Sequence, residues 1–111
     1  MKSYIPKQGD FVVATFDPQT GHEQAGRRPA LVISKQDFNQ ATGLAMICPV
    51  TNTNRHFSFH VTIPENDNLT GFIMVEQIKS LDIKARKIRH IGSVDSEILA
   101  EVLALLDACI Y

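Results

Sequence analysis

Short apolar runs alternate with turn-forming segments along the chain up to about residue 92. Residues 57–63 alternate apolar and polar side chains with a period of two, which is typical of a half-exposed strand. Residues 44–50 are almost continuously apolar, as in a buried strand. The pattern predicts strands at residues 9–16, 30–34, 44–50, 57–63, 71–75 and 87–91, with a helical turn inside 35–42.

The period changes beyond Asp95, where apolar residues recur at three- and four-residue spacing and therefore share one face of a helix. Ser93 or Asp95 is expected to cap this helix, and the acids Asp95 and Glu97 suit the positive end of its dipole. Its apolar residues are Ile98, Leu99, Val102, Leu103, Leu105, Leu106, Cys109 and Ile110. The predicted fold is mainly β with a C-terminal helix, a small SH3-like barrel with the helix packed on one side.

The chain has 111 residues, of which 44% are hydrophobic and 21% charged, so we expect one compact domain over residues 1–111. Cys48 and Cys109 lie in apolar surroundings, which favours buried, reduced thiols of a cytosolic protein over a disulfide. No apolar segment approaches the roughly 18 residues that a membrane span needs. We therefore expect a soluble, cytoplasmic protein that does not enter a membrane.

The formal net charge of −1 argues against a protein that coats nucleic acid, because such binding neutralises many phosphates at once. Basic residues nevertheless cluster at Arg27 and Arg28, at Lys79, and in the run from Lys84 to Arg89. These clusters allow a local basic cleft, and for the last run ordinary solvated surface charge is the other interpretation.

Residues 21–29 crowd an imidazole, a carboxylate, an amide and two guanidinium groups into a loop between two apolar runs. A plain strand connector needs only turn-forming residues, so these side chains suggest an anionic ligand that is rich in hydrogen-bonding groups. RNA fits this description, and so does a phosphorylated small molecule. The residues concerned are His22, Glu23, Gln24, Arg27 and Arg28.

Four segments carry a family resemblance: Asp17-Pro18, residues 21–32 (GHEQAGRRPALV), residues 48–51 (CPVT) and residues 75–82 (VEQIKSLD). Together they resemble the MazF/PemK family of toxin endoribonucleases, nearly end to end. The resemblance implies a homodimeric SH3-like barrel that cuts single-stranded RNA without a metal or other cofactor. It also implies a cognate antitoxin with an acidic disordered segment, DNA binding together with that antitoxin, and a role in growth regulation.

Metal-free RNA cleavage uses the ribose 2′-hydroxyl as nucleophile, so the protein needs only to move two protons and stabilise the charge at phosphorus. Arg28 matches the arginine of the family's Arg-Pro pair, and its planar fork suits bidentate binding of the scissile phosphate. A salt bridge to Glu23 is the structural alternative for Arg28. Thr51 matches the threonine of the family's Pro-x-Thr strand end, and we expect its hydroxyl to orient the substrate by holding a phosphate oxygen or the 2′-hydroxyl, although a threonine before Asn52 also fits ordinary turn chemistry.

Glu23 and His22 complete the candidate catalytic set. Glu23 has three possible roles: orienting Arg28, contacting a base edge, or acting as the general base. An imidazole such as that of His22 titrates nearest neutrality and is the more natural proton carrier. Relatives that carry serine at the position of His22 suggest that it contributes RNA contacts instead, and the sequence leaves the roles of the two residues open.

The candidate RNA-binding residues lie in or near the same segments. Glu76 and Gln77 match an acidic-Gln pair in which some family members use aspartate as general base, but Met74 stands where those members have arginine. Because of that departure we expect Arg28 and Thr51, and not Glu76, to carry the catalysis. A purely structural role for Glu76 is an equally open alternative. The full set is Gln24, Arg27, Thr53, Phe57, Glu76, Gln77 and Lys79.

Metal-dependent hydrolysis is poorly supported, because the four histidines show no close ligand spacing and neither cysteine belongs to a Cys-x-x-Cys pair. No nucleophile-elbow motif indicates a serine hydrolase either. We therefore expect no metal site. The alternative to a ribonuclease is a non-catalytic SH3-like module that binds RNA or a peptide, since a fold does not specify a function.

Overall fold

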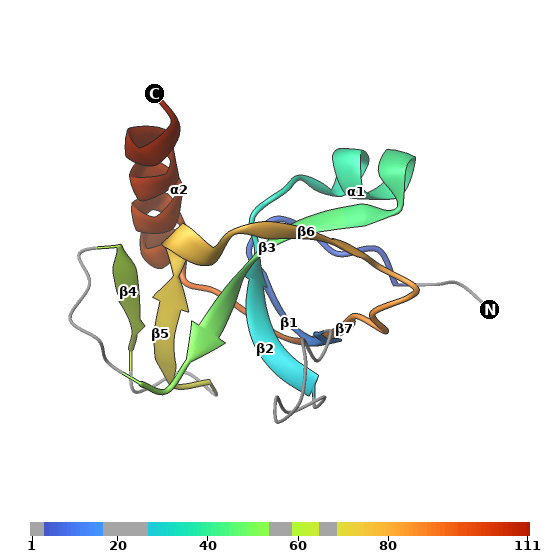
Figure 1. The fold of residues 1–111 in the computed structure, drawn as a ribbon, viewed down its shortest axis with the longest axis horizontal. Coiled ribbons are helices and arrows are strands. Elements are labelled where there is room, and N and C mark those ends of the chain that lie inside the picture. The colour runs from blue at the N-terminus through green and yellow to red at the C-terminus, as the bar shows by residue number, and fades with distance from the viewer. Residues whose placement is uncertain (1–3, 17–26, 54–58, 65–68) are drawn as a thin grey trace, which may run out of the picture.

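The computed structural model describes residues 4–16, 27–53, 59–64 and 69–111. Seven strands and two α-helices are found in this part of the chain (Figure 1). In chain order they are β1 (Asp10–Thr15), β2 (Arg27–Val32), α1 (Gln36–Thr42), β3 (Leu44–Thr51), β4 (His60–Ile63), β5 (Gly71–Met74), the 3-10 turn η1 (Val75–Gln77), β6 (Lys79–Asp82), β7 (Arg89–Ser93) and α2 (Ser96–Ile110).

Strand β3 is the centre of the sheet, because it pairs with three other strands along its length. Its first half pairs with β6, its middle pairs with β2, and its last residues, Val50 and Thr51, pair with β5. The main path of the sheet runs β4-β5-β3-β2-β1-β7, with all the pairings antiparallel. A strand that changes partners in this way curls the sheet, and the result is the predicted small barrel with a C-terminal helix.

The alternation of side chains along the strands divides the apolar core into two clusters. On β2, Leu31 belongs to the cluster shared with Val102 and Leu106 of α2, whereas Ala30 and Val32 belong to a cluster built from β1, β3 and β6. All three β2 residues are fully buried. Successive side chains of a strand point to opposite faces, so a central strand with apolar residues at consecutive positions is buried on both sides.

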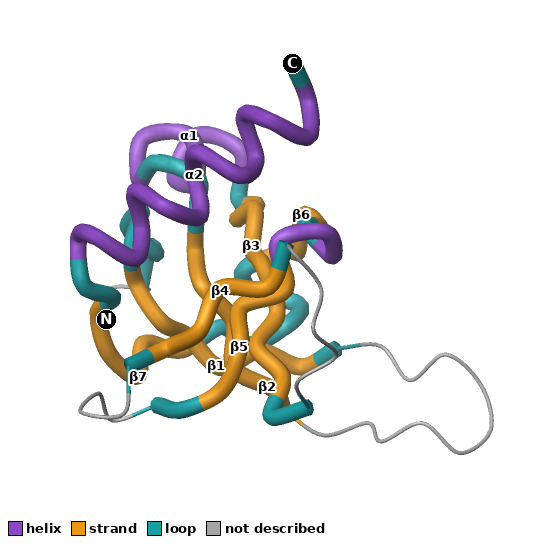
Figure 2. The backbone as a smooth tube through the Cα atoms, turned by 90° about the vertical axis from the view of Figure 1, so that its left-hand side faces the viewer, coloured by secondary structure: helices purple, strands orange, loops and turns teal. Residues whose placement is uncertain are grey.

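Helix α2 begins as the sequence predicts, since the side chain of Asp95 accepts a hydrogen bond from the backbone N of Glu97 at 3.2 Å. It packs its apolar side over β4 and η1, and Figure 2 shows both helices lying above the strands. Among the residues that the structure describes, no helix has the length and apolar content that a membrane span requires.

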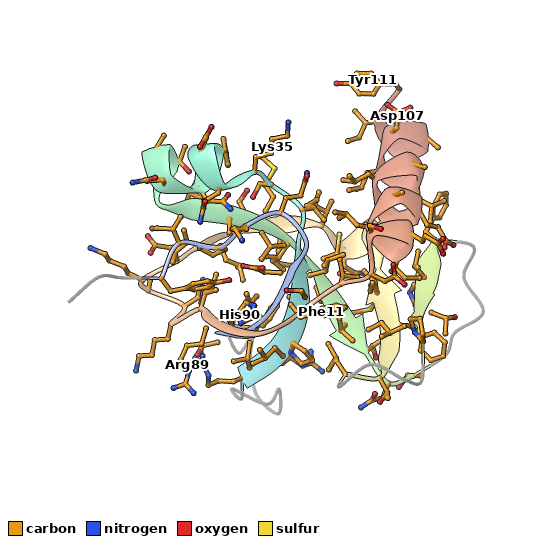
Figure 3. The ribbon with its side chains drawn as sticks, turned by 180° about the vertical axis from the view of Figure 1, so that it is seen from behind. Phe11, Lys35, Arg89, His90, Asp107 and Tyr111 are labelled. Atoms are coloured by element: carbon orange, nitrogen blue, oxygen red, sulfur yellow. The ribbon has the colours of Figure 1, made fainter. Side chains whose placement is uncertain are left out.

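The last turn of α2 corrects one expectation from the sequence. Cys109 was expected to be buried but is exposed, and the side chain of Ile110 is 63% exposed. The reason is visible in Figure 3, where the end of the helix that carries Asp107 and Tyr111 projects beyond the sheet. Cys48, by contrast, is fully buried as predicted, and both thiols are free.

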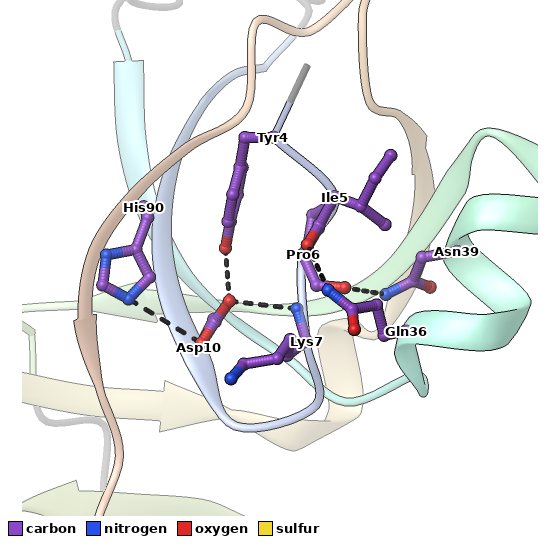
Figure 4. Close-up of polar contacts among 8 residues, drawn as sticks. All are labelled: Tyr4, Ile5, Pro6, Lys7, Asp10, Gln36, Asn39 and His90. Atoms are coloured by element: carbon purple, nitrogen blue, oxygen red, sulfur yellow. Dashed lines mark hydrogen bonds and ion pairs between the residues drawn. The ribbon is translucent and has the colours of Figure 1, made fainter. Parts of the chain in front are cut away.

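The segment before β1 is tied to the barrel by side-chain hydrogen bonds (Figure 4). Buried Asp10 accepts bonds from the Tyr4 hydroxyl and, at 2.9 Å, from the backbone N of Lys7, and His90 lies 3.7 Å from its other oxygen. Burial first, and then Asp10, raises the pKa of Tyr4 well above its usual range. Fully buried Asn39 donates to the carbonyl of Pro6 at 2.9 Å. These bonds order a segment that has no strand of its own.

Several strand boundaries differ from the sequence-based prediction, and β2, β7 and β6 show why. Strand β2 begins at Arg27 rather than Ala30, and β7 covers Arg89–Ser93 rather than residues 87–91. Strand β6, Lys79–Asp82, was not predicted, because its side chains are mostly polar and exposed. In each case pairing with a neighbouring strand decides where the strand lies, and single-chain periodicity does not contain that information.

Candidate active site in a cleft between β2 and β3

A cleft opens where β2 and β3 stop pairing. The β2–β3 ladder extends only to the pair Ala30 and Pro49, after which β3 pairs with β5. Pro29 and Pro49 have no backbone N–H to donate, which favours the end of the ladder at this point. The resulting cleft has a volume of about 450 Å³. Its lining residues are Arg27, Arg28, Pro29, Val50, Thr51, Asn52, Thr53, Leu69 and Thr70.

Arg28 of β2 and Thr51 of β3 both line this cleft. Each lies two residues beyond Ala30 and Pro49, the last pair of the β2–β3 ladder. Residues two apart on a strand share a face, so both side chains belong to the same side of the sheet. Arg28 is exposed, and its side chain makes no hydrogen bond or ion pair with another described residue. A cation and a hydroxyl are therefore available together at the opening of the cleft.

The neighbouring Arg27 is held in place instead. Its guanidinium donates to the Thr15 hydroxyl at 2.9 Å, to the carbonyl of Val13 at 3.3 Å and to the carbonyl of Lys87. The bonds connect the cleft wall on β2 to β1 and to the turn before β7. Arg27 thus acts as a structural clamp that also borders the cleft.

The Thr51 hydroxyl already has one partner, since it accepts a hydrogen bond from the backbone N of Thr53 at 3.2 Å. A hydroxyl that accepts in this way keeps its own hydrogen for donation to a ligand. Asn52 also lines the cleft, together with Leu69 and Thr70. The polar run Thr51-Asn52-Thr53 at the end of a buried strand was the available signal for Asn52.

Comparison with known proteins connects this geometry to a family. The family described as PemK-like, MazF-like toxin of type II toxin-antitoxin system matches residues 7–110. The chain belongs to this family.

Relatives of this toxin-family chain include the endoribonuclease toxin ChpB of Escherichia coli K12, which is 38% identical over 94% of the chain and 93% of its own length. The endoribonuclease toxin MazF of the same strain is 34% identical over 96% of both chains. Among solved structures, a chain of the MazE-MazF crystal structure (Form-II) from Deinococcus radiodurans superimposes with a TM-score of 0.90 at 38% identity, over 97% of both chains.

In this PemK-like, MazF-like chain, Glu76 does not reach the cleft. It lies in η1, at the end of β5 away from Thr51, and its carboxylate is 3.0 Å from Nε2 of His60. The His60 side chain is only 3% exposed and that of Glu76 is 26% exposed. Burial first, and then the Glu76 charge, raises the pKa of Cys48 to about 12. The contact between Glu76 and His60 favours a structural role for Glu76 over a catalytic one.

Two other predicted RNA-binding residues, Gln77 and Lys79, are not among the residues that line the cleft. Gln77 is exposed in η1, and Lys79 lies opposite Ile47 on β6 with its Nζ 5.4 Å from the ring centroid of Phe16. Thr53, by contrast, lines the cleft. In the basic run, Lys84, Lys87 and Arg89 are exposed, which is consistent with surface charge.

Four predicted residues, His22, Glu23, Gln24 and Phe57, lie outside the described residues. Within the described ranges, no three His, Cys, Asp or Glu residues form a group that could hold a metal ion. Among the described residues, the site therefore consists of the cleft with Arg28, Thr51, Asn52 and Thr53, bordered by the clamp residue Arg27.

Proposed function

We propose that this chain is the toxin of a type II toxin-antitoxin system and that it cuts single-stranded RNA endonucleolytically, without a metal cofactor. Membership of the PemK-like, MazF-like family supports the class of activity, as do the endoribonuclease relatives ChpB and MazF. The observation that carries the choice of site is that Arg28 and Thr51 line the same cleft of about 450 Å³, where the Arg28 side chain has no hydrogen-bonding partner among the described residues.

In the proposed reaction the ribose 2′-oxygen attacks the adjacent phosphorus while the bond from phosphorus to the 5′-oxygen breaks. A base removes the 2′-hydroxyl proton and an acid supplies one to the departing 5′-oxygen. The products are a 2′,3′-cyclic phosphate and a 5′-hydroxyl end. Glu23 and His22 are the proposed proton carriers, with no assignment of acid and base between them.

Arg28 is proposed to stabilise the negative charge that accumulates on the phosphate oxygens in the transition state. A guanidinium group holds its proton at neutral pH, so it acts as a fixed charge and bidentate donor rather than as the acid. Thr51 is proposed to orient the substrate by donating its hydroxyl hydrogen to a phosphate oxygen or to the 2′-oxygen. Both roles need a preorganised site, which usually supplies the largest part of such catalysis.

Contacts to the rest of the RNA are proposed for residues in and around the cleft. Arg27 and Thr53 line it, and Gln24, Phe57, Gln77 and Lys79 are proposed to bind flanking nucleotides by hydrogen bonding, stacking and charge. Glu76 is proposed to act through His60 as a structural residue.

The proposed assembly is a cytoplasmic homodimer neutralised by an antitoxin with an acidic, disordered segment, with which it also binds DNA. The MazE-MazF complex of Deinococcus radiodurans supports an antitoxin partner. An acidic segment would imitate the phosphates of RNA, so we propose that it occupies the β2/β3 cleft.

The deciding experiment incubates purified protein with a long unstructured RNA in EDTA and identifies the ends of the fragments. We expect discrete fragments with 5′-hydroxyl and 2′,3′-cyclic phosphate ends. A substrate with 2′-O-methyl at the cut site should survive, because the nucleophile is blocked. Cleavage that needs magnesium and leaves 5′-phosphates would reject the mechanism, and intact RNA with a gel shift would indicate the binding module instead.

The shared cleft is tested separately by titrating an uncleavable 2′-O-methyl RNA against the preformed complex of toxin and antitoxin. We expect RNA affinity to fall as antitoxin saturates the toxin. Unchanged affinity would place the antitoxin elsewhere and leave the cleavage mechanism intact.

A further inference from the structure

Gly71 is the first residue of β5 and lies beside the wall of the β2/β3 cleft. The next residue, Phe72, pairs with Thr51 of β3, and Gly71 itself pairs with Ile63 of β4. Its φ angle is +129°, a backbone conformation that residues with a side chain rarely adopt. The sequence therefore has glycine at a point where β5 joins the strand that carries Thr51.

A side chain at Gly71 would collide with the cleft wall. A Cβ atom there would lie 2.6 Å from the backbone oxygen of Thr51, closer than van der Waals contact allows. It would also lie 3.2 Å from Oδ1 of Asn52 and 3.2 Å from Cγ1 of Val50. The Thr51 oxygen is a backbone atom, so it cannot rotate away like the tip of a side chain, and the strand itself would have to move.

All three atoms belong to consecutive residues that line the cleft. A displacement of β3 at this point would move the Thr51 hydroxyl and the Asn52 amide relative to Arg28 on the facing strand. A misplacement of about 1 Å can lower a catalytic rate roughly 100-fold, even when the altered residue is not in contact with the reacting atoms.

We propose that Gly71 is a positioning residue for the proposed ribonuclease. Its missing side chain lets β5 close against the Thr51 carbonyl, and this contact holds Thr51 and Asn52 in place across the cleft from Arg28. The inference rests on the proposed function, but it concerns a residue that does not touch the RNA. Gly71 thus acts on the rate through Thr51.

The test compares Gly71→Ala with a matched control, Gly43→Ala. Gly43 ends α1, also has a positive φ of +75°, and a Cβ there would meet no atom within 4 Å. Both alanines therefore strain the backbone, but only the one at residue 71 also meets the cleft wall. We expect Gly71→Ala to lower kcat about 10- to 100-fold with a smaller change in KM, while Gly43→Ala cuts RNA at the wild-type rate.

A double-mutant cycle separates positioning from general destabilisation. Thr51→Val removes the hydroxyl that Gly71 is proposed to hold, so adding Gly71→Ala to this variant should lower kcat much less than it does in the wild type. Backbone amide NMR shifts of Thr51 and Asn52 should change in Gly71→Ala and remain in place in Gly43→Ala.

Equal kcat for the two alanine variants, or fully additive effects with Thr51→Val, would overturn the positioning role. So would a Gly71→Ala chain that fails to fold at low temperature and in a stabilising osmolyte while Gly43→Ala folds, because Gly71 would then support the fold and not the site. Loss of cleavage in the wild type would reject the proposed function alone, and the amide shifts of Thr51 and Asn52 would then decide the positioning role.

Discussion

Strand β5 joins two regions of the molecule that treat polar side chains in opposite ways. At its Gly71 end, the separation of β2 from β3 leaves Arg28 and Thr51 in an open cleft. At its other end, α2 packs against η1, and Glu76 is paired with the buried His60. The same strand thus runs from a cleft where the Arg28 side chain has no partner among the described residues to a site where the Glu76 carboxylate contacts His60. Polar and charged residues lie at both ends of β5, but only the candidate catalytic site at the Gly71 end has them in an open cleft.

The largest expected effect of a single substitution is that of Arg28→Ala. Loss of a preorganised charge-stabilising donor lowers a catalytic rate by about two to three orders of magnitude. Thermal stability should stay unchanged, because the Arg28 side chain makes no hydrogen bond with another described residue. Arg28→Lys should restore little activity, since a point charge cannot form the bidentate clamp. Single-turnover kinetics measure the cleavage rate and thermal melting measures the stability. Cleavage by Arg28→Ala at the wild-type rate would show that the cleft is not the catalytic end of β5.

Arg27→Ala should show the opposite balance within the same cleft wall. Its guanidinium makes three hydrogen bonds to β1 and to Lys87, so we expect the free energy of unfolding to fall by about 2 kcal/mol. Chemical denaturation measures this change, with Arg28→Ala as the matched control. A loss of cleavage in Arg27→Ala without any loss of stability would assign Arg27 to RNA binding instead of clamping.

Glu76→Gln tests the paired end of β5. This substitution keeps the shape but removes the charge beside His60, and hydrogen bonds to charged groups exceed neutral ones by about 1 kcal/mol. We expect stability to fall by about that amount, with RNA cleavage unchanged. Reduced cleavage at full stability would mean that Glu76 takes part in RNA chemistry and that the two ends of β5 share the function.

The smallest effect near neutral pH concerns Cys48. Its burial, and then the charge of Glu76, raise the pKa of the thiol to about 12. An unfolded thiol ionises near pH 8.5, so between about pH 9 and 12 the folded protein holds a proton that the unfolded chain has lost. Stability should therefore decline as pH rises through this range, and less steeply in Cys48→Ala. Urea denaturation at pH 7 and pH 10 measures the two slopes. Equal slopes would show that Cys48 does not contribute.

Much of the fold could be predicted from the sequence, because the hydrophobic period reports burial directly. The period-two and continuous apolar runs identified most strands, and Asp95 was found as the cap of α2. Strand β6 was missed, since its exposed side chains carry no such signal. The exposure of Cys109 was not predicted, because the spacing of apolar residues does not show where a helix extends beyond the sheet on which it packs.

For the candidate site, the sequence by itself determined which residues carry useful chemistry: the Arg-Pro pair at Arg28 and Pro29, and the threonine after Pro49 and Val50. Only the tertiary structure decided which of them meet. Arg27 and Arg28 are adjacent in the chain, yet the Arg27 guanidinium is hydrogen-bonded to Thr15, whereas the Arg28 side chain has no partner among the described residues and lines the cleft with Thr51. The need for glycine at position 71 is visible only in the structure, where a Cβ atom would lie 2.6 Å from the backbone oxygen of Thr51. Such contacts join residues far apart in the chain, and the local pattern of hydrophobic residues cannot predict which of them meet.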